Sequence, residues 1–296
     1  MKKAIYIALF LLTMGMVSCS DDDKISSETI FPTTSPQRDA FDLWLQKNYT
    51  STYNIDVKYK MEDIESDMTY QLVPADSSKS AKIAILMKYL WFDAYNEAVG
   101  QNFVKANGPR IIHFIGSSAY NSNNTETVGT AEGGLKVTLY KINDIDESRI
   151  QTDAYYHRLN EYYFHTMHHE FTHILHQKIP YDTNFKLISE GDYRSNDWYL
   201  YSVTYAQQKG FITKYAMSQP DDDFAETMST YITSSKSEWE ADLTTAGTEG
   251  AAIINQKLEI IRKYMEESWG LDIDQLRDII QRRASEMKTL DLEHLN

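Results

Sequence analysis

Apolar residues follow a mixed pattern up to about residue 150 and a helical pattern after it. In the first part, apolar residues three or four positions apart predict helices, and alternating apolar and polar residues predict strands. The last of these strands follows the Gly133-Gly134 turn. The predicted helices cover 39–49 and 81–99, and the predicted strands cover 54–61, 110–115 and 135–142.

Downstream of Tyr155 the spacing of apolar residues is helical in four further stretches. A small mixed sheet that leads into helices is an α+β arrangement. We therefore expect one α+β domain over 38–296, with a mixed lobe of about 38–178 and a mostly helical lobe of about 179–296. The four predicted helices cover 162–178, 222–232, 251–269, which Gly270 ends, and 273–287.

The N-terminal segment has the features of a secretion signal. Lys2 and Lys3 precede an apolar run over 4–17, which is too short to cross a bilayer as a helix. The run ends in Met-Val-Ser-Cys19, which resembles the signal box of bacterial lipoproteins, with Met where Leu is usual. The resemblance implies a signal peptide over 1–19 that ends at a lipidated Cys19.

Cys19 is the only cysteine, which excludes internal disulfides, thiolate zinc sites and a catalytic cysteine in the folded body. Residues 20–37 are mostly polar and are expected to form a flexible tether. Their acidic run at 21–23 resembles the surface-export signal of outer-membrane lipoproteins. These resemblances imply a lipid-anchored, surface-exposed protein of the bacterial outer membrane. The alternative is an ordinary cleaved signal peptide followed by a solvated linker.

The charge of the chain bears on its partners. The net charge is −14 with a pI near 5.0, and no stretch groups Lys or Arg with aromatic residues. A nucleic-acid partner is therefore not expected. Contact with a membrane is expected through the lipid anchor only.

The predicted helix over 162–178 contains most of the histidines of the chain. Six of the eight lie between His157 and His176. Four of them fall within about 80° of one another on a helix, opposite an apolar face. These four are His165, His169, His173 and His176.

We call these four aligned histidines the histidine stripe. Two of them belong to the segment His169-Glu170-Phe171-Thr172-His173, which has the pattern H-E-x-x-H. Two histidines one turn apart can bind one zinc ion, and the glutamate beside the first can act as general base toward a metal-bound water. The pattern predicts one Zn²⁺ per chain, bound by His169 and His173, with Glu170 as the base. The alternative is an amphipathic helix that is merely rich in histidine.

The other histidines of this helix are expected in supporting roles. His165 and His176 are expected to contact the metal ligands or solvent, because two histidines and a carboxylate complete a protein zinc shell. His168 lies off the stripe and is expected at the surface or beside a ligand.

The third ligand lies elsewhere in the chain. A metzincin is excluded because His176 and Ile179 stand where that class needs Gly and His. One candidate carboxylate is Glu190, in a Ser-Glu-Gly element that resembles the Asn-Glu-Gly of aminopeptidase-type gluzincins. A second is the run over 221–226, where Asp222 and Glu226 share one helix face. Acids at a helix N-terminus that only favour the helix dipole are the alternative.

The run from Tyr215 to Glu226 is similar to the second zinc element of the lethal-factor-like zincins. In that family a tyrosine precedes a ligand carboxylate by seven residues, and Phe-Ala-Glu follows. By position, the resemblance implies that Asp222 is the third ligand, that Glu226 accepts a hydrogen bond from a ligand histidine, and that Tyr215 stabilises the transition state opposite Glu170. Asp222 stands where that family has Glu, so Glu226 remains an alternative ligand.

The whole chain resembles the substrate import-associated zinc metallohydrolase lipoproteins, which are typically encoded beside outer-membrane nutrient-import pairs. Cys19 with its acidic run, the 169–173 motif and the 222–226 block carry this resemblance. It implies a zincin-like metallopeptidase that hydrolyses peptide or protein substrates at the cell surface and associates with such an import pair. The strand over 135–142 resembles the zincin edge strand that pairs with an extended substrate.

Two other functions remain open. The protein could be a surface accessory lipoprotein that captures a glycan or peptide and has a non-catalytic metal site, with some of its 21 Tyr and 5 Trp as a binding platform. It could also be a zinc hydrolase of non-peptide amides or esters. Glu170 favours catalysis, because a structural metal site needs no general base.

Overall fold

The computed structural model describes residues 37–61, 69–121, 125–127, 129–132 and 135–295. The predicted signal peptide with Cys19, and the predicted tether except its last residue, lie outside these ranges. Within the described ranges, no helix combines the length and the apolar content that a bilayer crossing requires. The boundaries of the single domain and of its two lobes stay predictions.

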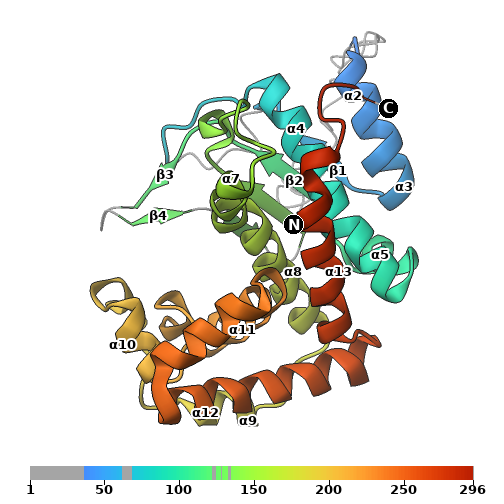
Figure 1. Ribbon diagram of the computed structural model, residues 1–296. Coiled ribbons are helices and arrows are strands. Elements are labelled where there is room, and N and C mark those ends of the chain that lie inside the picture. The colour runs from blue at the N-terminus through green and yellow to red at the C-terminus, as the bar shows by residue number, and fades with distance from the viewer. Residues whose placement is uncertain (1–36, 62–68, 122–124, 128, 133–134, 296) are drawn as a thin grey trace, which may run out of the picture. The chain divides into compact units, whose positions relative to one another are not determined.

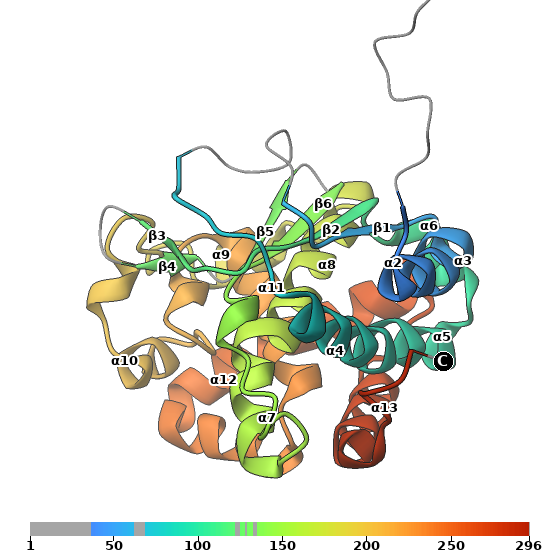
Figure 2. The ribbon, with the colours of Figure 1, turned by 90° about the horizontal axis from the view of Figure 1, so that it is seen from above.

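The strands of the described residues form a small mixed sheet and a separate pair. The strands are β1 (Asp56–Lys58), β2 (Ile111–Phe114), β3 (Ala119–Tyr120), β4 (Glu126–Thr127), β5 (Gly129–Glu132) and β6 (Lys136–Leu139). The sheet has the order β1-β2-β6-β5, with β1, β2 and β6 parallel and β5 antiparallel to β6. Figure 1 labels β1 and β2, and Figure 2 labels all four strands of the sheet. Strands β3 and β4 form the antiparallel pair.

The prediction that the strand over 135–142 is the edge strand is wrong. Strand β6 pairs with β2 on one side and with β5 on the other, so β5 lies at the edge. The physical reason is burial: Val137, Thr138 and Leu139 are all buried, as expected for a central strand that is covered on both faces. Strands β1 and β6 are also shorter than the alternating patterns that predicted them.

Two helical segments in the first half correspond to the two predicted helices. The first begins with a capping box in which Asp39 and Asp42 bond each other's backbone amides. The second begins at Ser77, four residues before the predicted start, because the Asp76 side chain accepts a hydrogen bond from the Lys79 amide and caps it. Their elements, with the short helix that follows, are α2 (Ala40–Leu45), η1 (Gln46–Thr50), α3 (Ser51–Tyr53), α4 (Ser77–Met87), η3 (Lys88–Phe92), α5 (Asp93–Val99) and α6 (Asn102–Asn107).

The second half is mostly helical, as the spacing of apolar residues predicted. The predicted helix over 251–269 begins earlier, at Lys236, because a kink at Gly247 (φ 69°) interrupts the helical pattern on which the prediction rested. The elements are η4 (Ile142–Asp144), α7 (Asp153–Leu159), η5 (Asn160–Phe164), α8 (His165–Lys178), α9 (Asn184–Ile188), η6 (Trp198–Leu200), α10 (Val203–Gln208), η7 (Tyr215–Met217), α11 (Pro220–Thr233), α12 (Lys236–Trp269), α13 (Ile273–Glu286) and η8 (Met287–Thr289). The predicted α+β class is confirmed.

Helix α8 lies between the sheet and α11, and it contacts both β5 and α11 (Figure 2). On its apolar side, the Phe171 ring packs edge-on against Trp91 at 5.5 Å and Tyr95 at 5.1 Å between ring centroids. Gly129 of β5 lies so close to α8 that a Cβ there would be 2.3 Å from the Thr166 side chain. Strand β5 and helix α8 therefore pack in direct contact.

The surface position considered for His168 is wrong. Its side chain is fully buried, and its Nδ1 lies 3.3 Å from the Tyr95 hydroxyl. The reason is that Tyr95 of α5 packs against the His168 ring, with 5.6 Å between the ring centroids. Burial lowers the pKa of His168 to about 3, so this imidazole is neutral and belongs to the core.

Candidate metal centre

Three ligand atoms from two helices converge on one point. His169 and His173 come from α8, and Asp222 comes from the first turn of α11, which Pro220 begins. The two Nε2 atoms are 3.0 Å apart, and Asp222 Oδ1 lies 3.3 Å from His173 Nε2 and 3.9 Å from His169 Nε2. His169 and Asp222 are buried and His173 is half-buried.

This donor set fits a catalytic zinc ion. Two imidazole nitrogens and one carboxylate oxygen are a common protein shell for zinc in hydrolases, with the fourth position open for water or substrate. Ligand atoms about 2.0–2.1 Å from a tetrahedral zinc lie about 3.3 Å from each other. The three observed separations bracket that value.

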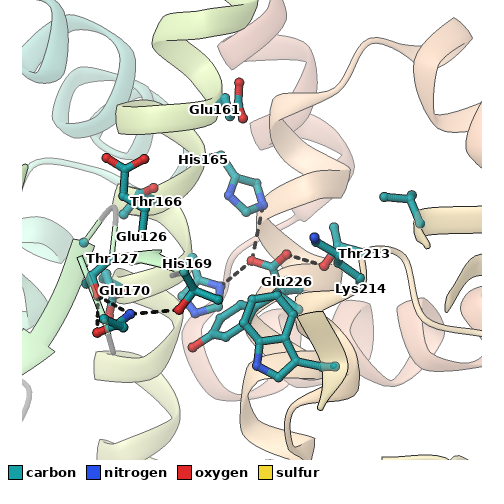
Figure 3. Close-up of a pocket in the computed structure, with 16 residues that line it drawn as sticks. Glu126, Thr127, Glu161, His165, Thr166, His169, Glu170, Thr213, Lys214 and Glu226 are labelled. Atoms are coloured by element: carbon teal, nitrogen blue, oxygen red, sulfur yellow. Dashed lines mark hydrogen bonds and ion pairs between the residues drawn. The ribbon is translucent and has the colours of Figure 1, made fainter. Parts of the chain in front are cut away.

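Glu226 lies beside the His169 ring (Figure 3). Its Oε1 lies 2.8 Å from His169 Nδ1, so the carboxylate pairs with the ring nitrogen that faces away from the cluster. Although burial alone would raise it, the charge of His165 and the bond from His169 hold the pKa of Glu226 at about 2. The geometry thus favours Asp222 as the third ligand and Glu226 as the group that orients His169.

Glu170 lines a cavity of about 510 Å³ beside the cluster. Burial raises the pKa of its carboxyl, and the carboxylates of Asp222 and Glu226 raise it further, against the opposing effect of His169 and His173. A buried carboxylate with a raised pKa is suited to accept and return a proton near neutral pH.

Tyr215 faces the same cavity from the 3₁₀ turn η7. Its ring centroid is 5.8 Å from that of His169 and 5.0 Å from that of Trp198. Burial of the phenol and the charges of Asp222, Glu170 and Glu226 raise the pKa of Tyr215. The phenol is therefore protonated and able to donate a hydrogen bond.

Residues 34–274 match a protein-family model described as "Putative zinc-binding metallo-peptidase". The chain belongs to this family. It is also similar to a "putative zinc-binding metallo-peptidase from Bacteroides caccae" in a crystal structure, with 42% sequence identity and a TM-score of 0.75 over 90% of this chain and 100% of that one. None of the curated proteins compared with the sequence matches it.

Membership in the metallo-peptidase family and the ligand cluster both support the predicted zinc-dependent metallohydrolase. The number of zinc ions per chain stays a prediction. Glu190, the other candidate ligand, is exposed in the turn that follows α9 and is not part of the cluster.

The remaining histidines of the stripe contact the centre without joining the cluster. His176 Nε2 lies 2.8 Å from His173 Nδ1 and forms a hydrogen bond with it. His176 therefore contacts the Nδ1 atom of one ligand histidine, and Glu226 contacts the Nδ1 atom of the other. Burial and the neighbouring His173 lower the pKa of His176 to about 4, which keeps its ring neutral and able to accept this bond. His165 Nε2 lies 3.0 Å from Ser229 Oγ and 3.6 Å from Glu226 Oε1.

Sequence reasoning missed several residues that hold the centre in place. Thr213 donates a hydrogen bond to Glu226, and Ser218 donates one to Asp222. Next to Asp222, the fully buried Asp223 pairs with Lys257 of α12 at 2.7 Å. No motif marks these contacts, because each joins α11 to a residue whose position depends on packing.

Proposed function

We propose that this protein is a zinc-dependent peptidase that hydrolyses peptide bonds in the cavity beside its metal centre. The observation that carries the proposal is the convergence of His169 Nε2, His173 Nε2 and Asp222 Oδ1 within 4.8 Å, next to a buried Glu170 that lines the cavity. A metal site that only stabilises the fold needs neither an adjacent base nor a cavity.

Each polar residue of the site has a role in this reaction. When bound, zinc lowers the pKa of a coordinated water and polarises the scissile carbonyl. Glu170 accepts a proton from the attacking water and passes it to the leaving amine. Tyr215 donates a hydrogen bond to the oxyanion that develops at the carbonyl, and Glu226 holds the His169 ring through Nδ1.

An extended peptide is the substrate that the surroundings favour. Strand β5 has β6 on one side and no partner on the other among the described strands, so its free edge can pair with a peptide backbone. Gly129 and Thr127 of the β5 and β4 strands line the same cavity as Glu170. The cavity walls also include Trp198 and Val203, which suit a substrate side chain.

Metal analysis and peptide hydrolysis test this proposal. The purified protein is expected to contain zinc by mass spectrometry and to cleave members of a peptide library. A chelator should abolish cleavage and added zinc should restore it. Zinc-loaded protein that cleaves no peptide would contradict the peptidase and leave the accessory binding role and the hydrolysis of non-peptide amides or esters. A protein that takes up no zinc would contradict the peptidase and every other zinc hydrolase.

We further propose that the protein is lipid-anchored through Cys19 at the surface of a bacterial outer membrane and works beside a nutrient-import pair. The signal-box resemblance and the acidic run after it support this location. In cells fed labelled palmitate, the wild-type protein is expected to carry the label and the Cys19→Ala variant to lack it. Equal labelling, or absence of label in both, would contradict the anchor.

A further inference from the structure

The turn that carries Tyr215 is bonded at both ends to the carboxylates of the metal centre. On one side of η7, Thr213 Oγ1 donates to Glu226 Oε2 at 2.5 Å (Figure 3). On the other side, Ser218 Oγ donates to Asp222 Oδ2 at 2.5 Å. We call these two hydrogen bonds the clasp.

Each hydroxyl of the clasp lies at a residue that also bonds the backbone of the turn. Thr213 Oγ1 accepts from the Ala216 amide at 3.1 Å, and the Ser218 amide donates to the Tyr215 carbonyl at 2.8 Å. Thr213 is β-branched, which restricts its χ1 and keeps its hydroxyl in one direction. A shift of the turn therefore breaks bonds to both carboxylates.

The carboxylate atoms used by the clasp are those that the metal cluster leaves free. Asp222 offers Oδ1 to the cluster and Oδ2 to Ser218. Glu226 offers Oε1 to His169 and Oε2 to Thr213. Both carboxylates and Ser218 are buried, so water cannot easily replace the lost partner.

We propose that Thr213 and Ser218 are positioning residues, whose clasp holds the Tyr215 phenol at the metal centre in the orientation that catalysis needs. This inference rests on the proposed peptidase function. The turn has a further attachment, a hydrogen bond from the Arg194 amide to the Met217 carbonyl at 2.6 Å. Loss of the clasp is therefore expected to displace Tyr215 without unfolding the turn.

A double-mutant cycle tests whether the clasp acts through Tyr215. Thr213→Val keeps the shape and removes the hydroxyl, and it is expected to lower kcat about 10- to 100-fold, as a misplacement of about 1 Å can. KM should stay within about threefold, because the affected contact forms in the transition state. In the Tyr215→Phe variant, adding Thr213→Val should lower kcat almost no further.

Conservative and matched variants separate positioning from general packing. Thr213→Ser retains the hydroxyl and should retain most of kcat. Thr227→Val, which removes a neighbouring α11 hydroxyl bonded to Asp223 rather than to the cluster, should leave kcat unchanged. The proposal is overturned if Thr213→Val lowers kcat by the same factor with and without Tyr215→Phe.

Two readouts do not depend on activity. The first is the NMR resonance of Tyr215 in protein with ¹³C-labelled tyrosine, which is identified by its absence in Tyr215→Phe. This resonance is expected to shift in Thr213→Val and in Ser218→Ala. It is expected to stay in place in Thr213→Ser. Zinc affinity, measured by competition with a chromophoric chelator, should fall roughly 10- to 100-fold in Ser218→Ala, and should not change in Tyr215→Phe.

The outcomes distinguish failure of the clasp from failure of the proposed function. If the zinc-loaded wild type cleaves no peptide, the peptidase proposal fails, and the Tyr215 resonance still decides the clasp. An unmoved Tyr215 resonance in both Thr213→Val and Ser218→Ala overturns the clasp whether or not the protein is a peptidase.

Discussion

Replacing Glu170 with glutamine is expected to lower kcat for peptide hydrolysis by about 100- to 10,000-fold, the usual contribution of a positioned general base. Glutamine has nearly the same shape and still accepts hydrogen bonds through its amide oxygen, but it cannot take a proton from the attacking water. Because Glu170 is not part of the ligand cluster, the variant should bind zinc as the wild type does. The measurements are steady-state kinetics and zinc content on the same preparation.

The matched control for this variant is Glu161→Gln. Glu161 lines the same cavity, so its substitution removes one negative charge from the cavity wall without touching the predicted base. We expect this control to change kcat much less than Glu170→Gln does. A zinc-loaded Glu170→Gln enzyme that retained more than a tenth of the wild-type kcat would show that another group moves the proton.

Alanine at Asp222 is expected to weaken zinc binding by well over 100-fold, whereas alanine at Glu226 should weaken it by roughly 10- to 100-fold. The difference follows from the contacts of the two carboxylates. Asp222 Oδ1 lies within 4 Å of both ligand nitrogens, while Glu226 bonds the opposite nitrogen of His169. Competition with a chromophoric chelator measures both affinities.

Glu190→Ala is the control for the third-ligand experiment. Glu190 is an exposed acid outside the cluster, so its removal should leave zinc affinity unchanged. If Glu226→Ala weakened zinc binding more than Asp222→Ala did, Glu226 would be the third ligand. Loss of zinc in Glu190→Ala alone would mean that the chain folds around the metal differently from this structure.

Secondary structure was predictable where one local pattern extends over several turns. Helix α8 was expected because its apolar and histidine positions recur at helical spacing, and α13 was expected for the same reason. Only the part of α12 that follows Gly247 was predicted, because a glycine with positive φ interrupts the helical pattern there. Strand β5 was missed, because its residues, Gly-Thr-Ala-Glu, include no large apolar side chain that could alternate with polar ones.

The residues of the candidate site also differ in how far a local sequence pattern predicts them. His169, Glu170 and His173 lie within one helical turn of each other, so their spacing along the chain already brings two imidazoles and a base together. The supporting contacts carry no such signal. Whether Thr213 reaches Glu226, and whether α5 buries His168, depends on how separate elements pack.

The amino-acid sequence alone was enough to predict the α+β class, the histidine helix, the zinc chemistry and the two candidate carboxylates of α11. These properties come from residue types and short-range periodicity, which act between near neighbours. Only the tertiary structure placed Asp222 rather than Glu226 in the ligand cluster, made β5 rather than β6 the edge strand, and joined the Tyr215 turn to Asp222 and Glu226 by hydrogen bonds. Each of these depends on the register and distance between segments far apart in the chain, which are decided when their apolar faces pack together.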